Sequence, residues 1–354
     1  MPGEFLIVGA GAVGLTSALS LLQSGYRVTL VERGMAGQEA SWAGGGILSP
    51  LCSWDYSDAV TRLAHLSMDR FAEAAASLQS ATGIDPEYQC SGMLILPPYQ
   101  TEQAAEWCKQ HHVELRQVNL EEQLKGRNGE ALLLPNVAQV RNPRLLAALR
   151  MRVEMLGGVI LEQQEVRKIE VSNDRVTALH TEQSNLAADG YIIAAGAWSK
   201  TLLAKHALNL EVRPIRGQIL LFKFDTPPFR HILLKKNLYF IPRNDGHVLV
   251  GSTLEDVGFD KSTTTEARDS LVARACEIFP EWRDIKPIRH WAGFRPGSPD
   301  NIPVIGRHPQ IFNLYANTGH FRYGVTMSLA SAELLLNEID GKAQPIPVAE
   351  YSWH

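Results

Sequence analysis

The chain runs Phe5-Leu-Ile-Val-Gly-Ala-Gly-Ala-Val-Gly-Leu-Thr-Ser-Ala-Leu-Ser-Leu-Leu-Gln-Ser-Gly-Tyr-Arg-Val-Thr-Leu-Val-Glu32 near its start, and this order of residue types predicts a strand, a helix and a second strand. The short apolar run from Phe5 to Val8 is typical of a buried strand. An Ala- and Leu-rich helix follows as far as Ser24, and Gly25 stands where a left-handed helix cap is favoured. Arg27 to Val31 predicts the second strand, which leads directly into the acid Glu32.

The three glycines of this segment have the G-x-G-x-x-G spacing, and each has its own task. Gly9 makes a tight turn, Gly11 lets the backbone approach a pyrophosphate, and Gly14 lets the helix pack closely on the strand. The helix N-terminus faces the phosphates, and Glu32 can accept a hydrogen bond from a ribose hydroxyl. We therefore expect a dinucleotide site here; the alternative is a glycine-rich turn in an ordinary strand–helix–strand unit. The residues expected at the site are Gly9, Gly11, Ala12, Val13, Gly14, Glu32 and Arg33.

Length and composition limit the classes of protein to consider. The 354 residues are enough for two domains or one large domain, and 45% hydrophobic with 20% charged residues is typical of a globular protein. The net charge of −4 and the lack of a dense Lys/Arg stripe argue against a nucleic-acid partner. Without a basic leader or a membrane-length apolar run, we expect a cytoplasmic protein with no membrane contact. Four scattered cysteines without C-x-x-C spacing predict free thiols, no disulfide and no metal site.

Two segments indicate further ligand-facing positions. Residues 37–46 contain four glycines and several small residues, which suggests a loop lying against a ligand. A flexible surface loop is the alternative, and Trp42, Ile47 and Leu48 argue against it. Tyr191 to Ser199 reads as a buried strand that runs into Gly196 at the carboxyl edge of a doubly wound sheet, where ligands bind.

The pattern changes after Arg213. Residues 218–224, 237–242 and 247–252 predict strands, Asn244-Asp245-Gly246 predicts a hairpin turn, and residues 266–279 predict a helix. This combination is typical of an antiparallel sheet inserted into the nucleotide-binding domain. A strand at 313–319 and a helix at 327–340 would then complete that domain at the C-terminus.

Five blocks give the chain a more specific resemblance. They are Gly9–Gly14 with Glu32, the Ser41–Gly46 loop, Tyr239–Gly246 continuing to Val250-Gly-Ser-Thr, Trp291–Gly297 continuing to Pro303–His308, and Gly319–Gly324. Together they resemble the D-amino-acid oxidase superfamily of FAD enzymes, over essentially the whole chain. The last three blocks are most similar to the glycine oxidases that serve thiamine biosynthesis.

This resemblance implies an α/β fold in which an FAD-binding, Rossmann-like domain of the glutathione-reductase type carries an inserted antiparallel-sheet substrate domain. We expect residues 1–84, 138–214 and 292–354 in the FAD-binding domain, and 85–137 and 215–291 in the substrate-binding domain. FAD should be bound non-covalently, because the C-terminal segment lacks a cysteine that could tether it. The resemblance adds these cofactor-binding residues: Ala40, Ser41, Gly44, Gly45, Gly46, Val166, Gly196, His320, Phe321, Arg322, Tyr323, Gly324, Val325 and Thr326.

An oxidase of α-amino acids must hold a carboxylate, and an arginine beside the flavin suits that task. Arg295 is the expected anchor, on a rigid turn between Gly293-Phe294 and Pro296-Gly297; a structural surface arginine is the alternative. Tyr239 can donate to the same carboxylate, unless it is an ordinary strand aromatic, and Arg322 can border the substrate. Leu254 is expected near the amine, where related oxidases can carry methionine. We expect no catalytic residue of the chain, because a neutral amine can lose its hydride to the flavin directly, and we expect His320 to serve in backbone contact or packing.

The activity implied is the oxidation of glycine, and of sarcosine or small D-amino acids, to the imine and then to glyoxylate and ammonia, while O2 is reduced to H2O2. A dehydrogenase that passes electrons to a quinone and a non-catalytic flavin-binding subunit remain alternatives. A nicotinamide dehydrogenase is less favoured, because the Gly319–Gly324 block has no role in one. The partners implied are a small amino-acid substrate, O2 and further copies of the chain in a homo-oligomer, often a tetramer.

Overall fold

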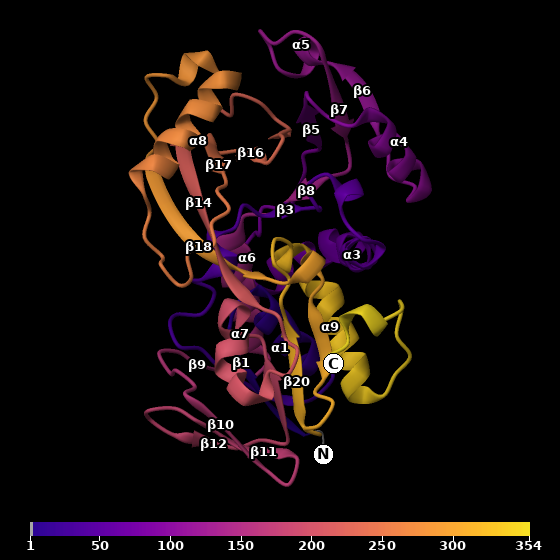
Figure 1. Cartoon of the computed structure of the whole chain (residues 1–354), viewed down its shortest axis with the longest axis vertical. Helices are drawn as coiled ribbons and strands as arrows, with labels where there is room; N and C mark the ends of the chain where they lie inside the picture. Colours follow the sequence, from indigo (N-terminus) through magenta and orange to yellow (C-terminus); the bar gives the residue numbers. More distant parts are fainter. Residues whose placement is uncertain (1–2) are drawn as a thin grey trace.

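The structure is a computed structural model that describes residues 3–354. Its first sheet has six strands in the order β19-β20-β13-β1-β2-β9 and lies in the lower half of Figure 1. All neighbouring strands are parallel except β19 and β20, which are antiparallel. The strands are β1 (Glu4–Val8), β2 (Arg27–Val31), β9 (Val159–Leu161), β13 (Gly190–Ile193), β19 (Val304–Arg307) and β20 (Leu314–Thr318).

Both faces of this sheet are covered, as the uninterrupted apolar strands require. Phe5 and Ile7 of β1 pack against helices on one face, while Leu6 and Val8 pack on the other face. The first face carries α1 (Ala12–Gln23), α3 (Asp58–Thr82), α6 (Asn142–Met155) and α9 (Gly324–Asp340). The second face carries α7 (Ser199–Leu203) and a three-stranded sheet of β10 (Lys168–Ser172), β11 (Arg175–His180) and β12 (Asn185–Leu186).

The predicted helix cap at the end of α1 is confirmed. Gly25 has φ +89°, and the Tyr26 N–H donates to the Leu21 carbonyl at 3.1 Å. Such a left-handed residue is strained for any side chain except glycine, so the sequence alone determines where this helix ends.

The second sheet has eight strands in the order β18-β14-β17-β16-β15-β5-β7-β6 and lies in the upper half of Figure 1. It is antiparallel except for the parallel pair β15 and β5. One face packs under α8 (Thr265–Ile278), and the other contributes to the wall of the site. Its strands are β5 (Met93–Leu96), β6 (Arg116–Asn119), β7 (Glu130–Leu134), β14 (Arg213–Lys223), β15 (Ile232–Lys235), β16 (Leu238–Pro242), β17 (His247–Gly251) and β18 (Arg289–Gly297).

Smaller elements connect the two sheets. A three-stranded sheet of β3 (Ile47–Leu48), β8 (Ala138–Gln139) and β4 (Gln89–Cys90) lies between them, and α2 (Ala40–Ala43) precedes it. Helices α4 (Thr101–Gln110) and α5 (Leu120–Gln123) flank the outer strands of the larger sheet. No helix within residues 3–354 combines the length and the apolar composition needed to cross a membrane.

The environment predicted for Arg295 is wrong, because this residue lies in strand β18 and not on a turn. β18 pairs with the long strand β14 over its whole length, with Arg295 opposite Ile215. Glycine and proline near Arg295 disfavour a strand locally, but strand preference depends strongly on tertiary pairing. Pro296 is tolerated because β18 is the edge strand of the sheet.

Candidate active site

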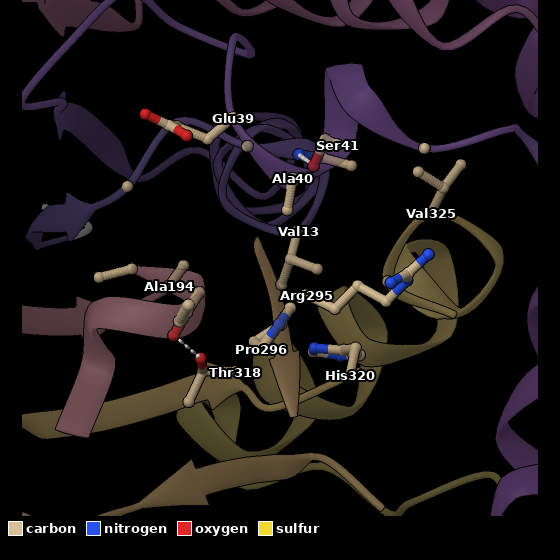
Figure 2. A pocket seen from close by; sticks show the side chains of 18 of the residues that line it. Val13, Glu39, Ala40, Ser41, Ala194, Arg295, Pro296, Thr318, His320 and Val325 are labelled. Atoms are coloured by element: carbon tan, nitrogen blue, oxygen red, sulfur yellow. Dashed lines mark hydrogen bonds between the residues drawn. The ribbon is translucent and has the colours of Figure 1, made fainter. Parts of the chain in front are cut away.

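A cavity of about 480 Å³ lies where the carboxyl edge of the six-stranded sheet meets the face of the larger sheet. Figure 2 shows Val13, Ser41, Arg295 and His320 around it. The starts of α1 and α9 also line it, so two helix N-termini with their partial positive charge face the same space. The volume and the mixed polar and apolar lining are those of a cofactor or small-ligand site.

All but one of the residues predicted at the glycine-rich end lie together on the cavity wall. Gly9, Gly11, Ala12, Val13, Glu32 and Arg33 all line the cavity. The Glu32 carboxylate accepts from the Ala10 N–H at 2.9 Å and from the Gly34 N–H at 3.0 Å, which holds it at the end of β2. Gly14 does not line the cavity. A Cβ on it would lie 1.9 Å from the Gly9 carbonyl oxygen, so it permits the close packing expected of it from behind the site.

The segment 40–46 is a tightly held part of the cavity wall. Ser41 Oγ accepts from the Ala12 N–H at 2.9 Å, and Asn142 Nδ2 donates to the Ser41 and Gly44 carbonyls at 2.6 and 3.0 Å. The buried Arg243 donates to the Gly45 carbonyl at 2.7 Å. These bonds contradict a flexible surface loop. They also bring Ala40, Ser41 and the three glycines 44–46 to the cavity, as predicted.

Val166 and Gly196 line the cavity from the six-stranded-sheet side, and two unpredicted side chains join them there. The Arg33 guanidinium lies 3.4 Å from the centre of the Trp198 ring and pairs with Glu39 at 2.9 Å. Trp198 and Glu39 were missed because a single carboxylate in a loop and an aromatic after a strand carry no local signal of a site.

The chain segment before and at the start of α9 contributes all seven residues from His320 to Thr326 to the cavity. The His320 imidazole turns inward, where Nε2 lies 2.8 Å from Ser331 Oγ, and burial lowers the pKa of His320 to about 3. A buried, neutral imidazole fits the packing role that we expect of His320. Tyr323 donates to the Tyr56 hydroxyl, and burial raises the pKa of Tyr323 well above its usual value.

Arg295, Tyr239 and Arg322 converge at the other end of the cavity. The Arg295 guanidinium donates to Ser252 Oγ at 2.6 Å and to the Thr253 carbonyl at 3.3 Å. Burial lowers the pKa of Arg295, and the charge of Arg322 lowers it further, against an opposing effect of Tyr239. Within residues 3–354, no carboxylate forms an ion pair with either arginine. The two cations thus have no carboxylate partner among the described residues at this end of the cavity.

The position predicted for Leu254 is wrong: it does not line the cavity, and its side chain is 50% exposed. β17 ends at Gly251, and the chain then runs extended beside β14. Thr253 Oγ1 accepts from the Gln218 N–H, and Glu255 exchanges backbone hydrogen bonds with Arg216. Leu254 lies between Thr253 and Glu255, which are both held against β14, and half of its surface is exposed to solvent.

Ser252 takes the place beside the substrate end that Leu254 was expected to hold, because it lines the cavity and binds Arg295. It belongs to the Val250-Gly-Ser-Thr block, so the sequence did mark this region, but not which of its side chains turns inward. Leu51, Asn142 and Thr318 also line the cavity and were not predicted.

Comparison with known proteins agrees with this geometry. The model of the family described as DAO, FAD dependent oxidoreductase, matches residues 4–337. A glycine oxidase of Pseudomonas aeruginosa is 44% identical, and the alignment covers 99% of this chain and 99% of that protein. A Synechocystis protein named bifunctional protein ThiO/ThiG is 32% identical over 97% of this chain and 52% of its own length.

A solved structure supports the same assignment. The crystal structure of glycine oxidase from Geobacillus kaustophilus superimposes with a TM-score of 0.93 at 26% identity, covering 100% of this chain and 98% of that chain. The predicted fold class and the predicted FAD cofactor are confirmed. The chain belongs to the DAO family of FAD-dependent oxidoreductases.

Proposed function

We propose that this protein is an FAD-dependent oxidase of glycine, and of sarcosine and small D-amino acids. One observation carries the proposal: the Arg295 guanidinium is enclosed at the end of the cofactor cavity without a carboxylate partner. A planar guanidinium binds a carboxylate through two parallel hydrogen bonds, and an enclosed cation without a counter-ion is costly. A substrate carboxylate would supply the missing anion. The 44% identity to a glycine oxidase supports the same reading.

The residues present fit FAD. The N-terminus of α1 suits a pyrophosphate, and Glu32 suits a ribose hydroxyl. A Cβ on Gly45 would lie 2.4 Å from Ile241 Cδ1, so the close packing of this part of the cavity wall against β16 requires a glycine. We assign FAD binding to the cavity-lining residues named above, with Val166 beside the adenine and residues 320–326 beside the flavin. FAD, when bound, supplies the two-electron acceptor for the reaction.

The substrate end of the cavity would orient and prepare the amino acid. Arg295 and Tyr239 would hold its carboxylate, and Arg322 would lie close to it. Two positive charges in a desolvated site disfavour a third, so they lower the pKa of the substrate ammonium and favour its neutral amine. This explains how the reaction can proceed without a basic side chain of the protein. We nominate no catalytic acid or base.

Atoms and electrons balance without a further reactant. Glycine loses two electrons and two protons at the Cα–N bond to give the imine, and O2 takes up both to give H2O2. Water then adds to the imine, and ammonia leaves to give glyoxylate.

The test is an anaerobic titration of the purified holoenzyme with glycine, sarcosine, D-alanine and D-proline, followed by flavin absorbance. We expect glycine or sarcosine to bleach the flavin fastest, and admission of O2 to restore the spectrum with one H2O2 per cycle. Bleaching that a quinone reverses but O2 does not would make the protein a dehydrogenase. No bleaching with any of the four amines would refute catalysis by this site and leave a flavin-binding subunit.

Several wider assignments are part of the proposal. The ThiO name of a relative supports a role of the imine in assembly of the thiamine thiazole, and four free cysteines support a cytoplasmic location. We keep the division into an FAD-binding part (1–84, 138–214, 292–354) and a substrate-binding part (85–137, 215–291). Every strand of the six-stranded sheet falls in the first part, while β18 of the larger sheet crosses the boundary at residue 292. The resemblance to glycine oxidases supports a homo-oligomer, which sedimentation of the holoenzyme would test.

A further inference from the structure

We propose that Gly217 is a positioning residue for the substrate, because its missing side chain leaves the space in which the Arg295 guanidinium lies. The inference rests on the proposed role of Arg295 as the carboxylate anchor, and it concerns how the fold holds that anchor.

The strand pairing puts the two residues on one face of the sheet. Gly217 of β14 is opposite Gly293 of β18, and Arg295 is opposite Ile215, two residues away on each strand. Residues two apart in a strand point to the same side. The Arg295 side chain can therefore extend along the sheet surface over Gly217 and into the cavity.

The fit over Gly217 leaves no room for a side chain. A Cβ at this position would lie 2.0 Å from Arg295 Nη1 and 2.4 Å from both Cζ and Nη2. All three distances are well below van der Waals contact, so the guanidinium lies flat on the glycine. The strand backbone at Gly217 has no positive φ, so its conformation does not require glycine. The requirement comes from the side chain above it.

The same device recurs beside the second proposed carboxylate-binding group. A Cβ on Gly251 of β17 would lie 2.9 Å from the Tyr239 hydroxyl, and Gly251 is opposite Tyr239 in the β16–β17 pairing. Both groups that would hold the substrate carboxylate thus rest on bare backbone. Ser252 and Thr253, which directly follow Gly251, then fix the Arg295 guanidinium from its edge through hydrogen bonds at 2.6 and 3.3 Å.

The arrangement predicts which part yields when a methyl group is introduced. In Gly217→Ala the colliding atoms are the far end of a long, flexible side chain, so Arg295 moves and the strand stays. The displaced guanidinium loses its bonds to Ser252 and Thr253 and its alignment with the substrate carboxylate. Arg295 contacts the carboxylate in both the ground state and the transition state. Loss of these contacts therefore raises KM more than it lowers kcat.

The experiment compares four holoenzymes: wild type, Gly217→Ala, Arg295→Ala and the double variant. For each we would measure flavin content, thermal midpoint, KM and kcat for glycine, and the Kd of glycolate from the change in flavin absorbance. We expect Gly217→Ala to keep its flavin and thermal midpoint, and to raise KM and the glycolate Kd about tenfold or more. In the Arg295→Ala background the same change has nothing to displace, and we expect no further effect on either constant.

Each contrary outcome has its own meaning. Unchanged KM and glycolate Kd in Gly217→Ala, with Arg295→Ala strongly impaired, would overturn the role of Gly217 and leave the proposed function intact. Additive effects in the double variant would also overturn it, because Gly217 would then act on another group. Loss of flavin from Gly217→Ala that the double variant does not restore has the same consequence. Near wild-type constants in Arg295→Ala would instead refute the proposed carboxylate anchor itself.

Discussion

Replacing Arg295 with alanine removes the group on which the proposed function depends most. The guanidinium can give the substrate carboxylate two hydrogen bonds, each worth about 1.5–3 kcal/mol because the partners are charged. Together they amount to about 3–6 kcal/mol, or about 10²- to 10⁴-fold in kcat/KM. Arg322 faces the same cavity and retains part of the attraction, so we expect the lower half of that range.

The stability of the protein should respond in the opposite way to its activity. Burial lowers the pKa of Arg295, which shows that the fold disfavours its charge, and the side chain has only two hydrogen bonds in return. We therefore expect the thermal midpoint of Arg295→Ala to equal or exceed that of the wild type. Arg295→Lys should recover little activity, because a point charge does not reproduce the two parallel bonds.

The assay is oxygen uptake with glycine at saturating O2, together with stopped-flow measurement of anaerobic flavin reduction. The flavin spectrum without substrate serves as the control for an intact cofactor site. A kcat/KM within about threefold of wild type would contradict the reasoning, because so small a change is less than one charged hydrogen bond is worth.

Three further predictions follow from the cavity wall. FAD should leave the protein intact on heating or acid treatment, because no cysteine of residues 3–354 lines the cavity; flavin that stays with the denatured chain would contradict this. Arg243→Ala should raise the Kd of FAD about tenfold or more in equilibrium dialysis, because it removes charged donors that lie 2.7 Å from the Gly45 carbonyl and 2.7 Å from Gln139 Oε1. An unchanged Kd would show that the segment 40–46 keeps its conformation without Arg243. The pKa of His320 falls from 6.5 to about 3 on folding, so the unfolded chain binds a proton in this window that the native protein does not, and stability is lost as pH falls from 6.5 toward 3. His320→Asn should flatten that part of the stability curve measured by thermal denaturation, and a curve unchanged in slope would contradict the assignment.

Local chemistry is enough to predict the start of the chain and its turns. Gly9 and Gly25 have φ values of +105° and +89°, and Gly246 of the predicted hairpin has +82°. These conformations are open to glycine and strained for most other residues, so each glycine determines the local path of the backbone. The regular apolar runs between them settle which segments become strands and helices. For this reason every residue predicted at the glycine-rich end except Gly14 lines the cavity.

The substrate end depended on pairing between distant segments. Arg295 reaches the cavity because β18 pairs with β14 along its full length, and its guanidinium has room because Gly217 lies beneath it. Leu254 faces solvent because the extended chain after β17 pairs with Arg216 through its neighbour Glu255. The residues next to a position in the sequence do not determine the register between two strands. They also do not determine which side chains of an irregular segment face the cavity. Both follow from which long-range pairing buries the most apolar surface and satisfies the most backbone hydrogen bonds, and that is a property of the whole fold.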